Sequence, residues 1–220
     1  NLLCSHSPKV VEVCQGATKD ILVGDVISGG VGTVRFVDRR FLDNIPPPAG
    51  LTSQQYGRLL LPINNNTGVT FNTNVNGAPF VAPAGTGYSS DPEVYTGAYW
   101  YEVRIRDEAR CEKTCTLKVV VHPRPQIVRL DQTYDVNCST PNGGAISILG
   151  SSRNQTLSFQ YTQVGSGNWL PGTPDRAAYA FRPLAVPAQY TLQIRDDLPG
   201  PVGPCTSAVA TVNLGVQAAP

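Results

Sequence analysis

The chain has little charge and no methionine. Of its 220 residues 15% are charged, and the net charge at pH 7 is +1. Because nucleic acids and anionic membrane surfaces attract strongly basic chains, neither is expected as a partner. The sequence also lacks an apolar run near the ~20 residues that a membrane-spanning helix needs, and no signal peptide stands at its start. We therefore expect no membrane span, and we expect the chain to be a mature or excised product.

Side chains that support catalysis are also scarce. The chain has two histidines, His6 and His122, and neither lies in a nucleophile or metal-binding motif. Only Cys111 and Cys115 come near the spacing of a zinc knuckle. We expect no enzyme activity, no cofactor and no metal site. A secreted hydrolase that uses His6 is the least favoured alternative.

Glycine and proline are abundant, with 21 and 19 residues, while 41% of the chain is hydrophobic. Disordered chains combine such turn formers with few apolar residues, which is not the case here. The balance instead favours short strands joined by many turns. The sequence therefore predicts an all-β protein.

One phrase occurs twice and indicates a repeated module. Tyr101–Asp107 reads Tyr-Glu-Val-Arg-Ile-Arg-Asp and precedes Cys111, while Tyr190–Asp196 reads Tyr-Thr-Leu-Gln-Ile-Arg-Asp and precedes Cys205. Each copy alternates apolar and polar residues, as a half-buried strand does. Acidic residues end each copy, at Asp107-Glu108 and Asp196-Asp197. Their carboxylates are candidates for calcium binding or for ion pairs with the preceding arginine, but such residues are more often solvated turn residues. The repeat predicts a protein built by stacking domains.

The first domain is expected to span residues 1–122. Alternating β-branched and aromatic residues predict its strands: Lys9–Val13, Asp20–Val23, Gly32–Val37, Gly68–Phe71, Tyr99–Ile105 and Thr116–Val121. A longer insertion lies around residues 40–66. Within it, Ser53–Leu60 is predicted as a helical turn that Ser53 caps.

The second domain is expected to span residues 123–220. The boundary is placed at His122–Pro125, because two prolines in four residues favour a stiff, extended connector. The predicted strands that follow are Gln126–Leu130, Gly144–Ile148, Thr156–Tyr161, Ala178–Phe181, Tyr190–Ile194 and Ser207–Leu214. This number of short strands is typical of a sandwich of immunoglobulin-like size. The predicted fold is two tandem immunoglobulin-like β-sandwiches.

The second domain resembles a known family in several motifs: Asp135–Cys138, Gly143–Ile148, Tyr190–Asp196 and Cys205. Together they are similar to the immunoglobulin-like repeats of Bacteroidetes gliding-motility surface adhesins. The first domain is similar at its ends, through Val13–Gly16 and Tyr101–Cys111. The resemblance implies a secreted, repeat-built, noncatalytic surface protein of bacterial origin.

The six cysteines suggest disulfides and an oxidising, extracellular compartment. In such a sandwich, the loop after the first strand and the loop before the last emerge at one end, so Cys138 is expected to bond Cys205. The same logic pairs Cys14 with either Cys111 or Cys115, and the sequence does not choose between them.

Cys4 has no assigned partner in this scheme. If Lys9–Val13 forms a full strand, Cys4 and the remaining cysteine lie at opposite ends, beyond the reach of a disulfide. Two alternatives remain. In the favoured one, the N-terminal segment folds back and Cys4 bonds within its own domain; in the other, Cys4 links to a neighbouring molecule.

Three aromatic positions are candidates for ligand contact. Adjacent residues of a strand face opposite sides, so Trp100 is expected in the core and Tyr99 and Tyr101 are candidates for an exposed platform for sugars. A core position for these tyrosines is the favoured alternative. Trp169, in the polar loop Gly165–Trp169, is the better candidate for an exposed contact.

The predicted function is that of a noncatalytic extracellular structural or adhesive protein, a building block of a surface fibre, adhesin stalk or filament. Self-association with neighbouring copies is expected, with Leu2-Leu3 or Ala208–Val216 as segments that pair with an exposed strand edge. The alternative is a module that binds a ligand, most plausibly surface glycans.

Overall fold

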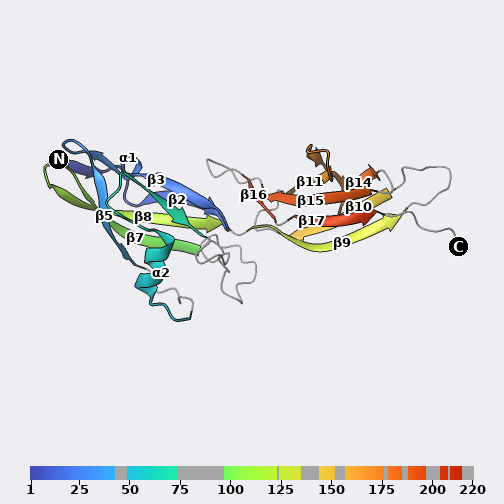
Figure 1. Ribbon diagram of the computed structural model, residues 1–220, viewed down its shortest axis with the longest axis horizontal. Helices are drawn as coiled ribbons and strands as arrows, with labels where there is room; N and C mark the ends of the chain where they lie inside the picture. The colour runs from blue at the N-terminus through green and yellow to red at the C-terminus, as the bar shows by residue number, and fades with distance from the viewer. Residues whose placement is uncertain are drawn as a thin grey trace. The chain divides into compact units, whose positions relative to one another are not determined.

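The computed structural model divides the chain into two compact units, unit 1 (Asn1–Pro123) and unit 2 (Arg124–Pro220). Figure 1 labels their elements. The structure describes residues 1–42, 49–73, 97–122, 124–134, 144–151, 157–175, 178–184, 188–196, 204–207 and 209–214. Almost all elements in these ranges are strands, so the predicted all-β fold is confirmed.

The main sheet of unit 1 has four strands. Their order across the sheet is β2 (Lys9–Cys14), β8 (Glu112–His122), β7 (Gly97–Arg106) and β5 (Arg35–Phe41). Strand β7 pairs antiparallel with both β8 and β5, whereas β2 pairs parallel with β8. Strand β8 is therefore hydrogen-bonded on both of its edges.

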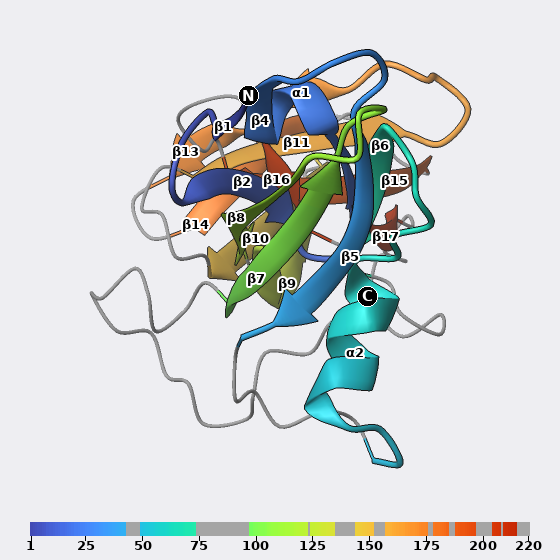
Figure 2. The same cartoon turned by 90° about the vertical axis from the view of Figure 1, so that its left-hand side faces the viewer.

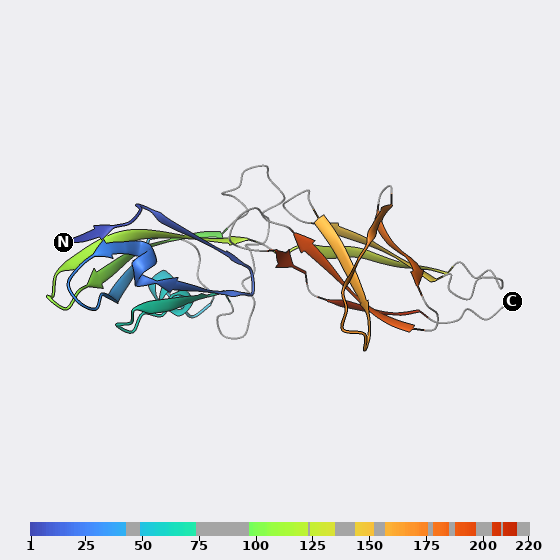
Figure 3. The same ribbon diagram turned by 90° about the horizontal axis from the view of Figure 1, so that it is seen from above.

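The opposite layer of unit 1 is an antiparallel pair, β3 (Thr18–Leu22) and β6 (Gly68–Asn72). Figure 3 shows this layer facing the four-stranded sheet. A second antiparallel pair joins β1 (Leu2–Cys4) to β4 (Ile27–Gly29). Strand β4 comes directly after the short helix α1 (Val23–Val26) in the chain. Together the layers make a β-sandwich.

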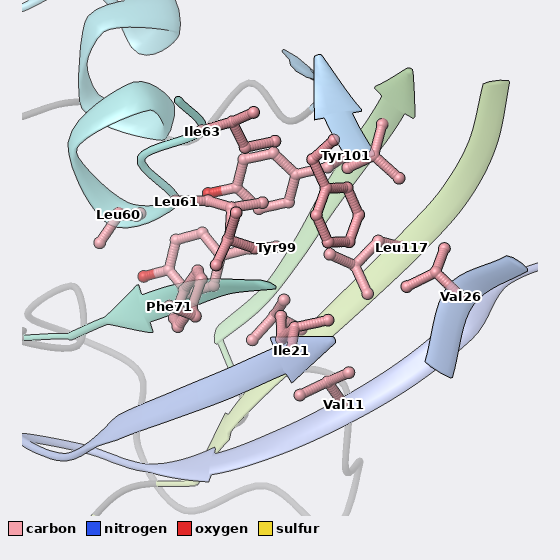
Figure 4. Packing of buried hydrophobic residues seen from close by; sticks show 14 of the residues in the cluster. Val11, Ile21, Val26, Leu60, Leu61, Ile63, Phe71, Tyr99, Tyr101 and Leu117 are labelled. Carbon is pink, nitrogen blue, oxygen red and sulfur yellow. The ribbon is translucent and has the colours of Figure 1, made fainter. Parts of the chain in front are cut away.

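The core of unit 1 lies between the two layers (Figure 4). Ile21 and Phe71 extend from the β3–β6 pair toward Tyr99, Tyr101 and Leu117 of the main sheet, and all five side chains are buried. The ring centroids of Phe71 and Tyr99 are 5.8 Å apart, a distance typical of aromatic contact. Side chains that alternate along the strands thus supply one buried face to each layer.

Helix α2 (Ser53–Leu60) covers the edge of the sheet beside β5, as Figure 2 shows. The helix lies where the sequence predicts it, but its N-cap is Thr52, so the prediction of Ser53 as the cap is wrong. The Thr52 hydroxyl accepts from the Gln55 N–H at 3.2 Å, and the Gln55 side chain accepts from the Thr52 N–H at 2.8 Å. This reciprocal capping box begins the helix.

Unit 2 is a sandwich of two sheets. One has the order β13 (Thr173–Asp175), β14 (Ala178–Leu184), β10 (Gly144–Ser151) and β9 (Gln126–Tyr134). In the other, β12 (Leu170–Pro171) and β11 (Leu157–Gln163) precede β15 (Ala188–Asp196), which also pairs with β16 (Cys205–Thr206) and β17 (Ala210–Leu214). The buried cluster between them includes Ile146, Ile148, Phe159, Leu192 and Val212.

The predicted strands differ from the observed ones mainly at their ends. The strands that sequence patterns missed are β1, β4, β12, β13 and β16, which have two or three residues each. Alternation needs about four residues to be recognised, so such short strands carry no pattern.

Gly57 is required by the close approach of α2 to β5. A Cβ at this position would lie 2.5 Å from the Cβ and Cγ of Phe41. Alanine raises helix propensity by about 1 kcal/mol, whereas overpacking a core costs about 1–3 kcal/mol, so the clash dominates. We expect Gly57→Ala to lower the free energy of unfolding by about 1 kcal/mol or more, measured by urea denaturation.

Gly24 in helix α1 provides the matched control, because a Cβ there meets nothing within 4 Å. We expect Gly24→Ala to be neutral or to stabilise the protein by up to about 1 kcal/mol. Equal effects of the two substitutions would contradict the packing argument.

Candidate functional site

The repeated phrase forms a central strand in each unit. In unit 1 it lies in β7, between β8 and β5, and in unit 2 it lies in β15, between β11 and β17. Both copies turn the same positions inward, and the buried residues are Tyr101, Val103, Ile105 and Asp107 in one and Tyr190, Leu192, Ile194 and Asp196 in the other. The repeat is thus an inward-facing stripe that ends on a buried carboxylate.

Asp107 ties two loops together at one end of unit 1. Its Oδ2 accepts from the Val31 N–H at 3.1 Å, and its Oδ1 accepts from the Cys111 N–H at 2.8 Å. The Glu108 N–H donates to the Val31 carbonyl at 3.1 Å. Because both carboxylate oxygens of Asp107 hold backbone amides, this residue organises loops and is poorly placed to bind calcium.

Glu108 adds a second tie between the same loops. Hydrogen bonds from the side chain and backbone of Thr33 lower the pKa of the Glu108 carboxyl. The carboxylate also lies where a Cβ at Gly32 would be, and Gly32 has φ +64°, a backbone conformation that favours glycine. We call this contact between the loops, made by Val31, Thr33, Asp107 and Glu108, the loop clasp.

The arginine before Asp107 does not pair with it. Arg106 Nη2 lies 2.6 Å from Glu112 Oε1, on the neighbouring strand β8. Successive residues of a strand face opposite sides, so Arg106 points to solvent while Asp107 points inward. An ion pair within the Arg-Asp dipeptide is therefore absent in unit 1.

The structure joins Cys4 to Cys115 within unit 1, whereas Cys111 is exposed and free. Both partners expected for Cys14 are therefore wrong, and so is the assignment of Cys111 to a disulfide. Cys14 is disulfide-bonded, as is Cys205. Cys138 lies outside the described residues, so its predicted bond to Cys205 stays a prediction.

The parallel pairing of β2 with β8 explains the correction. Cys14 at the end of β2 is opposite His122, whereas Lys9 at its start is opposite Leu117. Seven residues of strand separate His122 from Cys115, about 23 Å at ~3.3 Å per residue, far beyond the roughly 7 Å limit of a disulfide. The segment before Lys9 instead brings Cys4 to Cys115.

Tyr99 and Tyr101 are completely buried, so they form no exposed platform for sugars, and the favoured alternative of a core position is confirmed. The Tyr101 hydroxyl donates to the Gly57 carbonyl at 3.2 Å in the core. The expectation that Trp100 packs inside is wrong, since it belongs to the opposite face of β7. The sequence itself indicates the outer face for Trp100. Glu102 and Arg104 lie on the same face of the strand as Trp100, and charged side chains are rarely buried in a core.

The outer face of β5, β7 and β8 is covered with paired charges. Arg104 lies 3.7 Å from Asp38 and 3.5 Å from Glu112, and Arg40 lies 3.6 Å from Glu102. The Lys118 ammonium lies 5.0 Å from the Trp100 ring centroid, a cation–π contact. Exposed pairs of this kind contribute at most about 1 kcal/mol each, and they keep this face hydrated rather than apolar.

Apolar side chains are exposed at several other places, and two groups of them are used below. In unit 2, the hairpin between β11 and β12 exposes Val164, Trp169 and Leu170, and Trp169 is 41% exposed. In unit 1, Leu3 and Val31 are more than half exposed. Val31 belongs to the loop clasp, and Leu3 lies on β1, whose Leu2 is opposite Gly29, so both are at the end of unit 1 away from His122. We call this surface the distal end of unit 1.

Two observations on the described residues bear on catalytic and metal chemistry. His122 Nε2 lies 3.3 Å from Glu12 Oε2 on β2, with no serine or cysteine nucleophile in that contact. Among the described residues, no group of three or more His, Cys, Asp or Glu side chains converges on a metal position. Likewise, none of the helices described is long and apolar enough to cross a bilayer.

Comparisons with known proteins concern the fold alone. No protein-family model and no curated protein matches the chain. Solved structures that match include eight N-terminal immunoglobulin domains of Down Syndrome Cell Adhesion Molecule, at 11% identity and a TM-score of 0.44 over 96% of this chain and 27% of that one. The human desmocollin-1 ectodomain matches at 19% identity and a TM-score of 0.33, over 98% of this chain and 36% of that one. Murine CEACAM1b matches at 12% identity and a TM-score of 0.31, over 94% of this chain and 96% of that one.

This chain is thus much shorter than the first of these structures, of which it spans 27%. Likeness at such identities says nothing about partners or activity. The Bacteroidetes resemblance of the second domain stays a prediction.

Removing the Asp107 carboxylate tests the loop clasp. Asp107→Ala leaves two amide donors without their acceptor, and each such loss costs about 1–3 kcal/mol. We expect the free energy of unfolding to fall by about 2–4 kcal/mol in chemical denaturation. Asp38→Ala, which removes an exposed ion pair, is the control and should cost less than about 1 kcal/mol.

The Glu108 interaction should depend on pH. Because its pKa is lowered in the folded state, the stabilisation is present above the ordinary pKa of glutamate and is lost as the pH falls through the lowered value. We expect Thr33→Val to raise the Glu108 pKa toward its ordinary value in a titration followed by NMR. Thr33→Ser keeps the hydroxyl and should leave the pKa low; equal pKa values in both variants would contradict the assignment.

Proposed function

We propose that the chain is a noncatalytic structural segment of an extracellular protein, a β-sandwich building block of a surface fibre, stalk or filament. The observation that carries this proposal is the direction of the first and last long strands in unit 1. Because β2 and β8 run parallel, the chain enters the sandwich at the distal end and leaves at the opposite end, beside His122. A chain that crosses a unit from one end to the other does not turn back within it, as suits a building block of a stalk or fibre.

Unit 2 supports the same proposal. The arrows of its first strand, β9, and its last, β17, point toward the same end of that unit (Figure 1). The path through unit 2 therefore also runs from one end to the other. Modules of this kind extend a chain with each copy that is added.

The disulfides favour an extracellular location for this segment. Cys4 and Cys115 are bonded, and Cys14 and Cys205 are also in disulfides. Such bonds persist in oxidising compartments and are rare in reducing ones. The Bacteroidetes-type adhesin repeat remains the family that we propose for the second domain.

Self-association is proposed to use the distal end of unit 1 and to be noncovalent. Cys4 is engaged inside its own unit, so it is not the link between copies, and β1 is held to β4 rather than offered to a neighbour. Leu3 and Val31 instead expose apolar area at the distal end, and a second copy would remove this area from water.

Charged substitutions at the distal end should abolish assembly. We expect Leu3→Asp combined with Val31→Asp to weaken self-association by at least about tenfold, or 1.4 kcal/mol, in sedimentation velocity, and to remove fibres from electron micrographs. Leu59→Asp, at an exposed position of α2, is the matched control and should leave assembly unchanged. A native chain that stays monomeric at all concentrations would overturn the proposal of self-association.

The alternative function, glycan binding, has one specific observation in its favour. Trp169 is 41% exposed beside exposed Leu170, as expected of an aromatic contact on a hairpin. If this alternative holds, Trp169→Ala loses at least about tenfold in retention on a glycan array. Trp100→Ala is the control, because Lys118 already covers that ring. No retention by the native chain would eliminate the alternative.

A further inference from the structure

The two copies of the repeated phrase differ at the positions that point outward. In unit 1 the central outward positions hold Glu102 and Arg104, which form ion pairs with residues of neighbouring strands. In unit 2 the matching positions hold Thr191 and Gln193. Both copies turn the same positions inward, so the difference lies in what each strand presents to solvent.

Threonines form a row across three strands on the outward side of unit 2. Thr191 of β15 is directly opposite Thr162 of β11 on one edge and Thr211 of β17 on the other. Directly opposite residues of antiparallel strands project from the same face of the sheet. Among the described residues at the outward positions of these three strands, Arg195 is the one that carries a charge. This side of the sheet thus presents neutral polar groups where unit 1 presents ion pairs.

A pair of side-chain amides lies on each side of the threonine row. Gln160 Nε2 donates to Gln193 Oε1 at 2.7 Å, and Gln189 Nε2 donates to Asn213 Oδ1 at 2.8 Å. Gln193 Nε2 in turn donates to the Ser207 carbonyl at 3.3 Å. Because neighbours hold these amides in place, less entropy is lost when their remaining donors and acceptors bind a ligand. We call the threonine row and these two amide pairs, on the outward side of β11, β15 and β17, the amide face of unit 2.

Trp169 lies at the β11 edge of the amide face. Strand β12 pairs with β11 so that Leu170 is opposite Tyr161. Trp169 directly precedes Leu170, and the same register brings it beside Thr162, at the end of the threonine row. Its side chain is 41% exposed. The amide face therefore has an accessible indole ring at its margin.

We propose that the amide face binds a neutral polysaccharide chain, with Trp169 stacking on one of its sugar rings. Sugar hydroxyls donate and accept hydrogen bonds, as amide and threonine side chains do. The apolar C–H face of a sugar ring packs on an exposed indole, which is apolar over its body and polar at its N–H. With Arg195 as the one charge among the described outward positions, the face is complementary to an uncharged ligand rather than to an acidic one.

The dimensions of the amide face favour a polymer over a single sugar. From Gln189 to Gln193 the strand advances about 14 Å, and three neighbouring strands span about 10 Å. A single pyranose ring covers only part of such an area. Several linked sugars can contact both amide pairs and Trp169 together.

Exposure to water alone does not account for the amide face. The paired charges of unit 1 already keep the equivalent face of that sheet hydrated. Ordered amides and hydroxyls beside an exposed indole instead match what a neutral sugar chain requires of a binding surface.

The inference rests on the glycan-binding alternative, whose site and ligand class it names, and it is independent of the proposed structural role. The two can fail separately. Electron micrographs of native chains test the fibre, whereas retention on polysaccharides tests the amide face.

The test is affinity electrophoresis of the full chain, with its disulfides intact, through gels that contain xylan, mannan or dextran, with alginate as the acidic probe. The test variant combines Thr191→Glu with Gln193→Arg, the residues that unit 1 has at the matching positions. We expect it to bind the retaining neutral polysaccharide at least about tenfold more weakly than the native chain does. Circular dichroism should show an unchanged fold, because unit 1 accommodates the same residues on its own strand.

The matched control is the reverse exchange in unit 1, Glu102→Thr combined with Arg104→Gln. It changes the same residue types on the equivalent strand and should leave retention unchanged. An equal loss in the two exchange variants would overturn the inference, because the effect would then not depend on the amide face.

A second variant keeps the test valid if the exchange disturbs unit 2. Asn213→Asp retains the oxygen that accepts from Gln189 but replaces an amide donor with a negative charge. We expect about two- to tenfold weaker binding, the effect of losing one hydrogen bond. Asn64→Asp, at an exposed position of unit 1, is its control and should have no effect. Retention of the native chain should also persist in ~1 M salt, because the contacts join uncharged groups.

The remaining outcomes separate this inference from the glycan alternative. Neutral polysaccharide binding that Thr191→Glu with Gln193→Arg and Asn213→Asp both preserve would overturn the inference and leave glycan binding to another surface. Retention by alginate alone would overturn it as well. No retention by any of the four polysaccharides would remove both the inference and the alternative function.

Discussion

The parallel pairing of β2 with β8 is the constraint on which the organisation of unit 1 depends. It sets the first long strand and the last in the same direction, so the chain enters and leaves the sandwich at opposite ends. It places Cys14 beside His122 and leaves Cys115 within reach of Cys4. The Cys4–Cys115 disulfide and the entry and exit of the chain at opposite ends of unit 1 are thus consequences of one strand pairing. If β2 and β8 were antiparallel, Cys14 would lie near the start of β8, and the chain would enter and leave the sandwich at the same end.

The polar residues of unit 1 are used mainly to hold the fold. Asp107 is buried and accepts two backbone amides, and Glu108 accepts from Thr33. Outside, charged side chains pair across β5, β7 and β8. Burying a carboxylate is costly unless amides satisfy it, which explains why the loops close tightly around this one position. The described surface also exposes small groups of apolar side chains, among them Leu3 with Val31 and Trp169 with Leu170.

Much of the fold was readable from the sequence, and particular residues explain the rest. Alternation located β7 and β15 and the capping pattern located α2, because these signals are local. The prediction that Trp100 lies in the core is wrong, because Trp100 shares its face of the strand with Glu102 and Arg104, and charged side chains keep that face in solvent. The partner of Cys4 was beyond prediction, because no local pattern states whether two strands far apart in sequence run parallel.

The sequence by itself determined the all-β class, the alternation of the repeated phrase that ends at Asp107 and Asp196, and the proline-rich connector after His122. These features depend on side-chain periodicity and backbone preferences that act within about ten residues. Tertiary structure alone decided that Cys4 bonds Cys115, that Tyr99 and Tyr101 are buried under α2 and β6, and that Cys111 stays free. Each of these depends on which strands pair and in which direction, a choice made by the packing of the whole sandwich.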